Sequence, residues 1–291
     1  MFTKIAIIGT GNVGTWLLKT LQNQTNLQIV SISSRKIVTL PKKFDLYIFA
    51  LKDDIYETVL QQISFKMPHA VHTSGSLSQN ILAPFAEKVG VVYPYQTIRE
   101  EKGEKEKGEG RKQKPYQSTP QPPPAGEKGF RLTSPLTGET DPCLSPAGGG
   151  LRGWKKCEIP ICIEASDPTF EDTLLQWANS IFGTVDKVNE KQRSAMHLAA
   201  VFANNFTNAM YEVAYQIFKE NNLDWSLIFP LLEHTLEKAK CNAPHSVQTG
   251  PAVRNDISIM GKHCNALQDK DLKRLYLLVS KIIQQQNKFI S

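Results

Sequence analysis

Three glycines near the N-terminus have the spacing of a loop that binds a dinucleotide. Gly9, Gly11 and Gly14 form a G-x-G-x-x-G pattern that follows a short apolar run and opens an amphipathic stretch. The first glycine permits a tight turn, the second lets the backbone approach a pyrophosphate, and the third allows close packing of the following helix. Backbone amides at Asn12 and Val13, at the start of that helix, would then face the phosphates.

The end of the second apolar run indicates which dinucleotide is bound. NAD-binding proteins usually carry an acidic residue there, which holds the ribose 2′-hydroxyl. This chain has Ser33, Ser34, Arg35 and Lys36 instead, with no carboxylate before Asp45. Hydroxyl and guanidinium groups suit a 2′-phosphate. We therefore expect NADP(H) in preference to NAD(H), the alternative being that the two cations are ordinary surface charges.

Two further strand ends contribute candidate cofactor contacts. Leu51 and Lys52 follow the third apolar run, and Ser74 follows the fourth. In an open parallel sheet, ligands bind outside the carboxyl ends of the strands, so these residues should border the cofactor. His72 precedes Ser74, and the sequence leaves open whether it is a buried histidine or a catalytic one.

A polar stripe interrupts a long apolar helix pattern in the second half of the chain. His197, Asn204 and Asn208 fall on one side of a helix that advances by about 100° per residue. One imidazole and two amides could serve as a general acid or base and as hydrogen-bond donors facing a substrate. A polar network between helices, or a solvent-facing surface, would account for the same residues.

An arginine in a rigid loop is the last candidate. Arg254 lies in the stretch "QTGPAVRNDISIMGKH" (248–263), shortly after a Gly-Pro turn and just before a predicted helix. A guanidinium there could bind a carboxylate or phosphate of the substrate. The alternative is a loop between two helices, held by an Arg–Asp pair.

The elements that must position these residues follow two patterns. Residues 1–99 alternate apolar runs with helical patterns, and one more run follows at residues 159–165. Strands that are apolar on both faces, alternating with helices, predict an α/β fold: a Rossmann-type, doubly wound parallel sheet. A 3.6-residue period from about residue 188 onward predicts an all-helical C-terminal domain. We predict strands and helices at the following residues: strands at 4–9, 27–33, 44–50, 70–73, 89–94 and 159–165, and helices at 12–24, 53–63, 78–89, 168–182, 188–218, 224–240, 256–268 and 269–289.

The predicted domains are a dinucleotide-binding domain at residues 1–99 and 157–188, and a helical substrate and dimerisation domain at 189–291. Residues 100–156 hold 8 of the 17 prolines and 10 of the 18 glycines, and few aliphatic side chains, so we expect a disordered insertion there. Half of the formal charge of +6 also falls in this segment, and the rest shows no basic stripe of the kind that binds nucleic acid.

Several classes of protein are disfavoured by composition. The chain has no apolar run long enough to span a membrane and no secretory leader at Met1, so a cytoplasmic protein is expected. Its five cysteines are an odd number without CxxC spacing, which argues against a disulfide framework or a zinc site.

Six motifs together resemble those of a bacterial two-domain family: "IAIIGTGNVG", "SSR", "VHTSGSL", "YPYQT", "HLAAVFANNFTNAMY" and "TGPAVRND". That family joins a Rossmann-like N-terminal domain to a helical C-terminal domain of unknown function. It is similar to the wider superfamily of 6-phosphogluconate dehydrogenase, pyrroline-5-carboxylate reductase and F420-dependent NADP reductase. The resemblance implies an NAD(P)-linked oxidoreductase that forms a homodimer through its helical domain.

One departure from that superfamily bears on mechanism. Its β-hydroxyacid dehydrogenases use a Lys-x-x-x-Asn pair on the first long helix, whereas here Lys191 is followed by Ala195, and His197 by Val201. That mechanism therefore does not transfer, and His197 becomes a substitute acid, with Asn204 orienting the substrate. The competing hypothesis is a non-catalytic protein that binds or senses a nucleotide.

Overall fold

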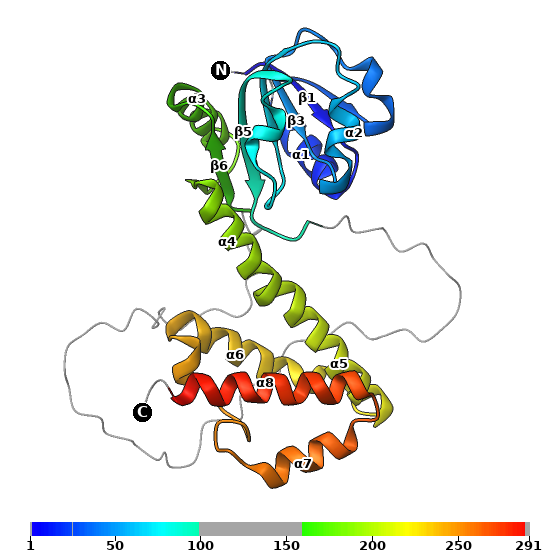
Figure 1. Cartoon of the computed structure of the whole chain (residues 1–291), viewed down its shortest axis with the longest axis vertical. Coiled ribbons are helices and arrows are strands. Elements are labelled where there is room, and N and C mark those ends of the chain that lie inside the picture. Colours follow the sequence, from blue (N-terminus) through cyan, green and yellow to red (C-terminus); the bar gives the residue numbers. More distant parts are fainter. Residues whose placement is uncertain (1, 25, 99–158, 289–291) are drawn as a thin grey trace, which may run out of the picture. The chain divides into compact units, whose positions relative to one another are not determined.

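The computed structural model describes residues 2–98 and 159–288, apart from residue 25 (Figure 1). The insertion predicted at residues 100–156 lies outside the described residues. The described chain forms two compact units, one ending at Met210 and one beginning at Tyr211. The division therefore falls about twenty residues beyond the expected boundary at residue 188, inside a helix.

The N-terminal unit contains a seven-stranded sheet in the order β2-β1-β3-β4-β5-β6-β7. Strands β1 to β5 are parallel, which confirms the predicted Rossmann-type sheet. Strand β6 pairs antiparallel with β5, so the expectation of a wholly parallel sheet was wrong at this edge. The strands span these residues: β1 Lys4–Ile8, β2 Gln28–Ile32, β3 Leu46–Phe49, β4 Met67–His72, β5 Ala86–Pro94, β6 Ile161–Ala165 and β7 Val185–Lys187.

Apolar side chains cover both faces of this sheet, because successive strand residues point to opposite sides. One face packs on α1 (Asn12–Gln22) and α3 (Pro168–Asn179), whose Leu17 and Trp177 are fully buried. The other packs on the short α2 (Tyr56–Leu60) and on 3₁₀ turns. The sheet is therefore covered on both faces, as a doubly wound fold requires.

One predicted helix is absent. The helix expected over residues 78–89 is reduced to a 3₁₀ turn at Gln79–Leu82. Pro84 stands two residues after this turn and lacks the amide hydrogen that would continue a helix. The chain from Ala86 onward instead pairs with β4, where it completes the parallel part of the sheet.

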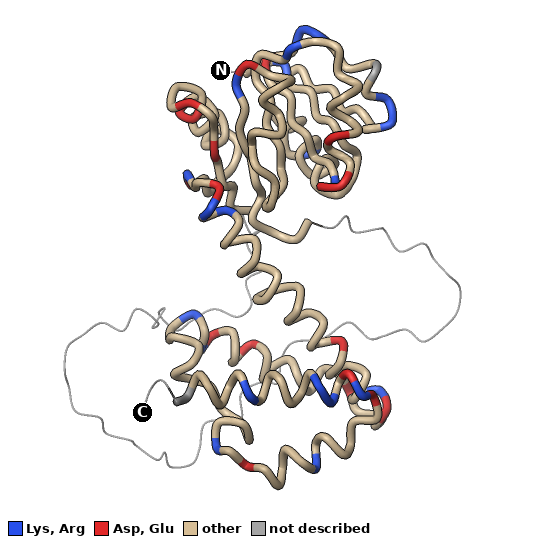
Figure 2. Tube along the Cα trace, viewed as in Figure 1, with Lys and Arg blue, Asp and Glu red and all other residues tan. Residues whose placement is uncertain are grey.

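The long helix expected across the second half is present, with an irregularity. α4 (Glu190–Ala200) continues through a π-helical turn at Val201–Phe206 into α5 (Thr207–Glu220). A π turn takes up one residue more than an α-helical turn, so the stripe expected from a constant 100° step does not continue unchanged beyond it. No Lys, Arg, Asp or Glu occurs between Arg193 and Glu212 (Figure 2).

The second unit consists of α5 with α6 (Phe229–Cys241), α7 (Ile257–Ala266) and α8 (Lys270–Lys288). Pro230, expected to kink a helix, lies in the first turn of α6, where its missing amide costs nothing. Among the described residues of this unit, only Ala252 and Ser280 are fully buried. The helical unit thus has almost no hydrophobic core of its own.

Two remaining expectations concern cysteines and membranes. Cys162 and Cys264 are free thiols. No helix in the described part of the chain combines the length and apolar character needed to cross a bilayer.

Candidate functional site

The three glycines of the loop between β1 and α1 have different surroundings. Gly9 has φ of +120°, and a Cβ there would lie 2.1 Å from the carbonyl oxygen of Ala50. A Cβ on Gly14 would lie 2.0 Å from the carbonyl oxygen of Gly9. A Cβ on Gly11 would meet no atom within 4 Å. The outer glycines are therefore required by the fold itself, and the central one borders open space.

That open space lies at the N-terminus of α1. Gly11 is the N-cap of this helix and has no side chain with which to cap it. The first amides of a helix have no partner within the helix and carry the positive end of its dipole. Asn12 is exposed and Val13 is partly buried against the core. The arrangement fits a diphosphate: backbone donors, a positive end and room above the backbone.

Neighbouring strand ends converge on the loop. The amide of Gly9 donates to the carbonyl of Ile32 at the end of β2 (2.8 Å), and the amide of Ala50, after β3, donates to the carbonyl of Ile8 (2.8 Å). Leu51 lies so near that its Cδ2 would be 3.3 Å from a Cβ on Gly9. The loop thus occupies the point at which the strand order changes direction, where open α/β sheets bind ligands.

The residues expected at the adenosine ribose follow β2 directly. The Ser33 hydroxyl accepts a hydrogen bond from the amide of Arg35 (3.4 Å) and caps a 3₁₀ turn that begins at Ser34. The side chains of Arg35 and Lys36 are exposed. Lys52 is exposed as well, beyond the end of β3. These cations remain accessible to a ligand.

The turn after β4 is organised by Ser74. Its hydroxyl accepts hydrogen bonds from the amides of Ser76 and Leu77, both at 3.1 Å, and the residue is 6% exposed. Ser76 in turn donates to the carboxylate of Asp53. The Ser74 side chain is therefore engaged in shaping its own turn.

His72 is buried at the base of the same turn. Its Nδ1 accepts a hydrogen bond from the amide of Ser74 (3.2 Å), while its Nε2 is buried with no partner among the described residues. Burial, and secondarily the positive charge of Arg193, lowers the pKa of His72 to about 4. Of the two alternatives left by the sequence, the geometry favours a neutral, buried histidine.

His197 lies at the other side of this turn, beside a tyrosine. Its Nδ1 is 3.1 Å from the hydroxyl oxygen of Tyr93, at the end of β5. A Cβ on Gly75 would lie 2.6 Å from the same Nδ1 and 3.0 Å from Cζ of Tyr93. Burial raises the pKa of Tyr93 to about 12, so the phenol stays protonated at neutral pH. The imidazole of His197 thus lies against both Tyr93 and the backbone of Gly75.

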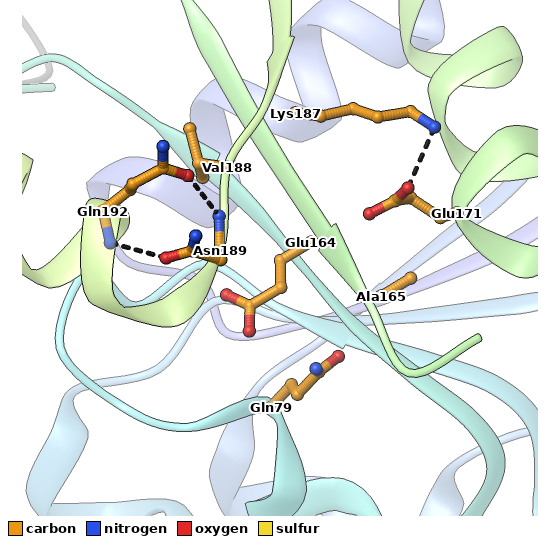
Figure 3. A pocket seen from close by; sticks show the side chains of 8 residues that line it. All are labelled: Gln79, Glu164, Ala165, Glu171, Lys187, Val188, Asn189 and Gln192. Atoms are coloured by element: carbon orange, nitrogen blue, oxygen red, sulfur yellow. Dashed lines mark hydrogen bonds and ion pairs between the residues drawn. The ribbon is translucent and has the colours of Figure 1, made fainter. Parts of the chain in front are cut away.

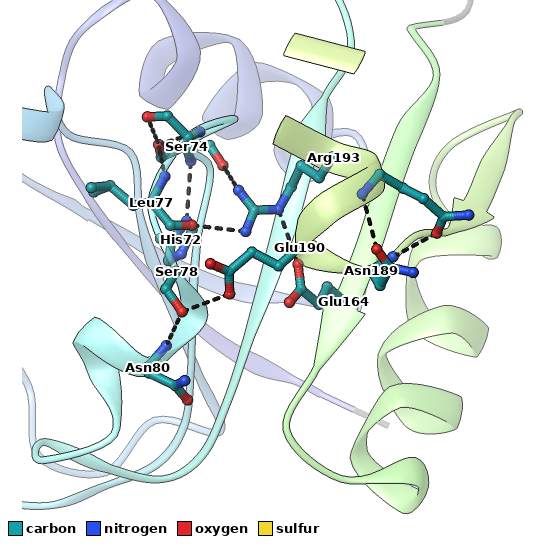
Figure 4. Close-up of polar contacts among 11 residues, drawn as sticks. His72, Ser74, Leu77, Ser78, Asn80, Glu164, Asn189, Glu190 and Arg193 are labelled. Carbon is teal, nitrogen blue, oxygen red and sulfur yellow. Dashed lines mark hydrogen bonds and ion pairs between the residues drawn. The ribbon is translucent and has the colours of Figure 1, made fainter. Parts of the chain in front are cut away.

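Figure 4 shows two residues of α4, Glu190 and Arg193, that contact the turn, and His197 follows on the same helix face. Glu190 accepts a hydrogen bond from the Ser78 hydroxyl (2.7 Å). Arg193, completely buried, donates to the carbonyls of Ser74 and Leu77 and to the carboxylate of Glu164 on β6. With His197, these residues follow the spacing i, i+3, i+7 that one helix face presents.

The remaining predicted residues are less closely associated. Asn204, in the π turn, donates through its amide to the hydroxyl of Thr97. Asn208 is exposed. Arg254 belongs to the helical unit, where it is exposed on a loop that contains Gly250 (φ +114°) and Asn255 (φ +52°). His197 and Asn204 therefore share one unit with the glycine loop, and Arg254 lies in the other.

Sequence reasoning missed four residues that contact this region: Tyr93, Thr97, Glu164 and Arg193. A signal for each was present. Tyr93 and Thr97 lie in the motif "YPYQT", Arg193 stands one helical turn before His197, and Glu164 is the single acid in the apolar strand "ICIEA". A lone charge in an apolar strand indicates a buried partner.

A polar cavity of about 350 Å³ lies beside Glu164 (Figure 3). None of the predicted site residues lines it, and it therefore does not coincide with the glycine loop. Burial raises the pKa of Glu164, opposed by its hydrogen bond to Arg193. The lining residues are Gln79, Glu164, Ala165, Glu171, Lys187, Val188, Asn189 and Gln192.

The fold and the glycine loop define a Rossmann-like dinucleotide-binding domain followed by a helical domain. Residues 159–283 match the family model of a domain of unknown function, DUF2520. The chain thus combines a Rossmann-like domain with this helical domain of unknown function, and the two-domain resemblance drawn from the motifs is confirmed. A comparison with curated proteins found no match.

Solved structures share the fold over nearly the whole chain. A candidate NADP oxidoreductase, BF3122 from Bacteroides fragilis, is 28% identical with a TM-score of 0.72, covering 97% of this chain and 98% of its own. Protein TM1727 from Thermotoga maritima is 18% identical with a TM-score of 0.59, covering 98% of both chains. A 1-pyrroline-5-carboxylate reductase from Streptococcus pyogenes is 15% identical with a TM-score of 0.51, covering 98% of this chain and 96% of its own. The last two similarities concern the fold alone.

Proposed function

We propose that this protein is an NADP(H)-dependent oxidoreductase acting on a small polar or anionic metabolite. The observation that carries the proposal is the open space at Gly11, at the uncapped start of α1, between two glycines that the fold requires. The similarity to the candidate NADP oxidoreductase of Bacteroides fragilis supports it.

The residues present fit the cofactor. The amides of Asn12 and Val13 would hold the diphosphate, and Ser33, Ser34 and Arg35 would hold a phosphate on the adenosine ribose. When bound, the nicotinamide supplies or accepts a hydride. The protein's own contribution is to orient both reactants and to exchange a proton.

In this proposal, His197 exchanges the proton with the substrate. Nδ1 of His197 and the hydroxyl of Tyr93 share a hydrogen bond, which leaves Nε2 to give a proton to the substrate or to take one from it. Nε2 has no hydrogen-bond partner within the described residues. Asn204 and Asn208 would orient the substrate.

Cofactor preference is tested by calorimetric titration of NADPH and NADH. Wild-type protein should bind NADPH more tightly. Arg35→Ala should weaken NADPH by about tenfold or more, the range of a lost charge-assisted hydrogen bond, and leave NADH nearly unchanged. The matched control is Lys42→Ala, a change at another exposed cation. Tighter binding of NADH, or no heat with either nucleotide, refutes the cofactor assignment.

Catalysis is tested separately, by following NADPH absorbance at 340 nm across a metabolite library. His197→Ala should bind NADPH as wild type does and lose turnover of any substrate found. Full turnover by this variant rejects the role of His197. Cofactor binding without turnover of any metabolite would instead favour the non-catalytic, nucleotide-sensing alternative.

We also propose that the helical unit pairs with a second copy of the same chain. Its described residues include thirteen large apolar side chains that are 39–73% exposed, on α5 to α8 and the segments between them. At roughly 150–200 Å² per side chain, this exposes on the order of 1,000 Å², whereas a standard interface buries about 800 Å² per partner. Because the unit has almost no core of its own, a second copy would supply one. These side chains are Tyr211, Tyr215, Ile217, Leu223, Leu227, Phe229, Leu231, Leu236, Ile257, Leu277, Leu278, Val279 and Ile282.

Sedimentation equilibrium tests the pairing. Wild-type protein should sediment at twice the mass of its 32.6 kDa chain. A double variant, Leu231→Glu with Leu278→Glu, should shift the protein toward monomer, because it places charges on the apolar faces of α6 and α8. Lys281→Glu on the same helix serves as control. A monomeric wild-type protein contradicts the proposal.

A further inference from the structure

We propose that Arg193 is a positioning residue that sets the orientation of the His197 ring through the turn at residues 74–78. The inference rests on the proposed function, in which His197 exchanges the proton. It assigns Arg193 no contact with substrate or cofactor.

Each of the three side-chain nitrogens of Arg193 has a partner within the protein. Its side chain is fully buried, and its Nε donates to Oε2 of Glu164 at 3.0 Å. The two terminal nitrogens donate to the carbonyl oxygens of Ser74 (3.1 Å) and Leu77 (2.8 Å). The Glu164 carboxylate neutralises the guanidinium. Its two terminal nitrogens form a rigid, planar fork that binds two main-chain oxygens. Arg193 can therefore act only through the turn that it holds.

The turn at residues 74–78 is held by its own hydrogen bonds, and the two terminal nitrogens of Arg193 bridge two of its carbonyl groups. The Ser74 hydroxyl closes it internally by accepting two amides, and Glu190 holds its far end through the Ser78 hydroxyl. Both carbonyls bound by Arg193 belong to this turn, one at each side of Gly75. A planar guanidinium fixes the separation of two acceptors, which a single ammonium point charge does not. The fork thus fixes where the backbone of Gly75 lies.

That backbone forms one wall of the space around His197. A Cβ on Gly75 would lie 2.6 Å from Nδ1 and 2.8 Å from Cγ of the imidazole, so the ring rests directly on the turn. Tyr93 lies next to this wall and hydrogen-bonds Nδ1. Arg193 stands four residues before His197, and one helix therefore sets both the ring and the wall against it. Releasing the turn would free the ring to leave Tyr93.

The experiment reads the imidazole directly. Arg193→Lys keeps a positive charge beside Glu164 and removes the fork. In ¹⁵N-labelled full-length protein, the ring nitrogens of His197, assigned by comparison with His197→Gln, report its tautomers. In wild type, the hydrogen bond between Tyr93 and Nδ1 should give one tautomer a preference about fivefold different from that of free imidazole. In Arg193→Lys this preference should fall toward that of free imidazole, and in the control Arg274→Lys, at an exposed ion pair, it should not change.

A second variant keeps the test decisive if Arg193→Lys does not fold. Gly75→Ala leaves the Arg193–Glu164 pair intact and places a methyl group against the ring, so it should produce the same loss of preference. An unchanged tautomer ratio in either folded variant overturns the positioning role. NADPH should still bind to both variants, because the glycine loop is untouched. A wild-type protein that does not bind NADPH would refute the proposed function and leave the tautomer result standing.

Discussion

The burial of His72 predicts a specific loss of stability in mild acid. The ordinary pKa of a histidine, 6.5, is lowered here to about 4, mainly because the ring is buried and secondarily because Arg193 is near. Between these two pH values the unfolded chain binds a proton that the folded chain does not, so stability falls as the pH is lowered. The slope is about 1.4 kcal/mol per pH unit, and roughly 3 kcal/mol should be lost between pH 6.5 and pH 4.

Urea denaturation at several pH values in this window measures the effect. His72→Asn removes the titrating group and keeps an acceptor for the amide of Ser74, so its stability should decline by roughly 3 kcal/mol less than that of wild type over this range. The exposed His245→Asn is the control and should follow wild type.

Other titrating groups do not mimic this difference. The pKa of Asp45 is lowered, so its contribution is lost only below its ordinary value of 3.8, outside the window. The pKa of Glu164 is raised, so its contribution has the opposite sign: stability falls as the pH rises above 4.5. Glu164 is present in both proteins, and the difference between them isolates His72. Parallel pH profiles for wild type and His72→Asn would refute the reasoning.

Four further predictions concern the glycine loop, the core and the helical unit. Gly9→Ala should destabilise the fold by more than about 1 kcal/mol, because φ is +120° and the methyl group meets the Ala50 carbonyl. Gly11→Ala should keep the wild-type melting temperature and weaken NADPH binding; a melting temperature lowered as much as that of Gly9→Ala would contradict this. Trp177→Ala should cost about 3–5 kcal/mol in urea denaturation, and a loss below about 1 kcal/mol would show that this core position collapses freely. The melting temperature of wild type should rise with protein concentration if a second copy completes the helical unit, and a constant value argues against it.

Much of the sheet could be predicted because its signals are local. Each strand through β5 is an apolar run that ends near a glycine, proline or polar cluster, and all were located within a few residues. The direction of β6 could not be predicted, since the insertion separates it from β5 and an apolar run carries no direction of its own. The helix expected at residues 78–89 failed because its pattern fitted a helix, while Pro84 and the pairing of β5 with β4 decided otherwise.

The glycine loop of the candidate site could be predicted, because backbone geometry determines it. The side-chain contacts around Arg193 and His197 were less predictable. The glycine spacing could be interpreted from the sequence because a side chain would clash at the first and third positions. Gly9 and Gly14 show these close contacts with the backbone. Tyr93 and Glu164 come from two different strands, and Ser74 follows a third. Arg193 reaches Glu164 and Ser74, and His197 reaches Tyr93, only through the register of α4 with the sheet. Such contacts depend on tertiary packing, which periodicity along a single helix does not contain.

The π turn explains why only two residues of the predicted polar stripe, His197 and Asn204, contact the segment from Tyr93 to Thr97, while Asn208 does not. Seven residues of helix between His197 and Asn204 rise roughly 10 Å, and four residues of extended chain between Tyr93 and Thr97 span roughly 13 Å. These lengths are close enough for both pairs to meet, as they do. The π turn ends at Phe206, and its extra residue changes the helical phase of every later position, so Asn208 leaves the stripe. On an ideal α-helix, the spacing of His197, Asn204 and Asn208 places them on one face. With the wider π turn, the same spacing separates Asn208 from the other two.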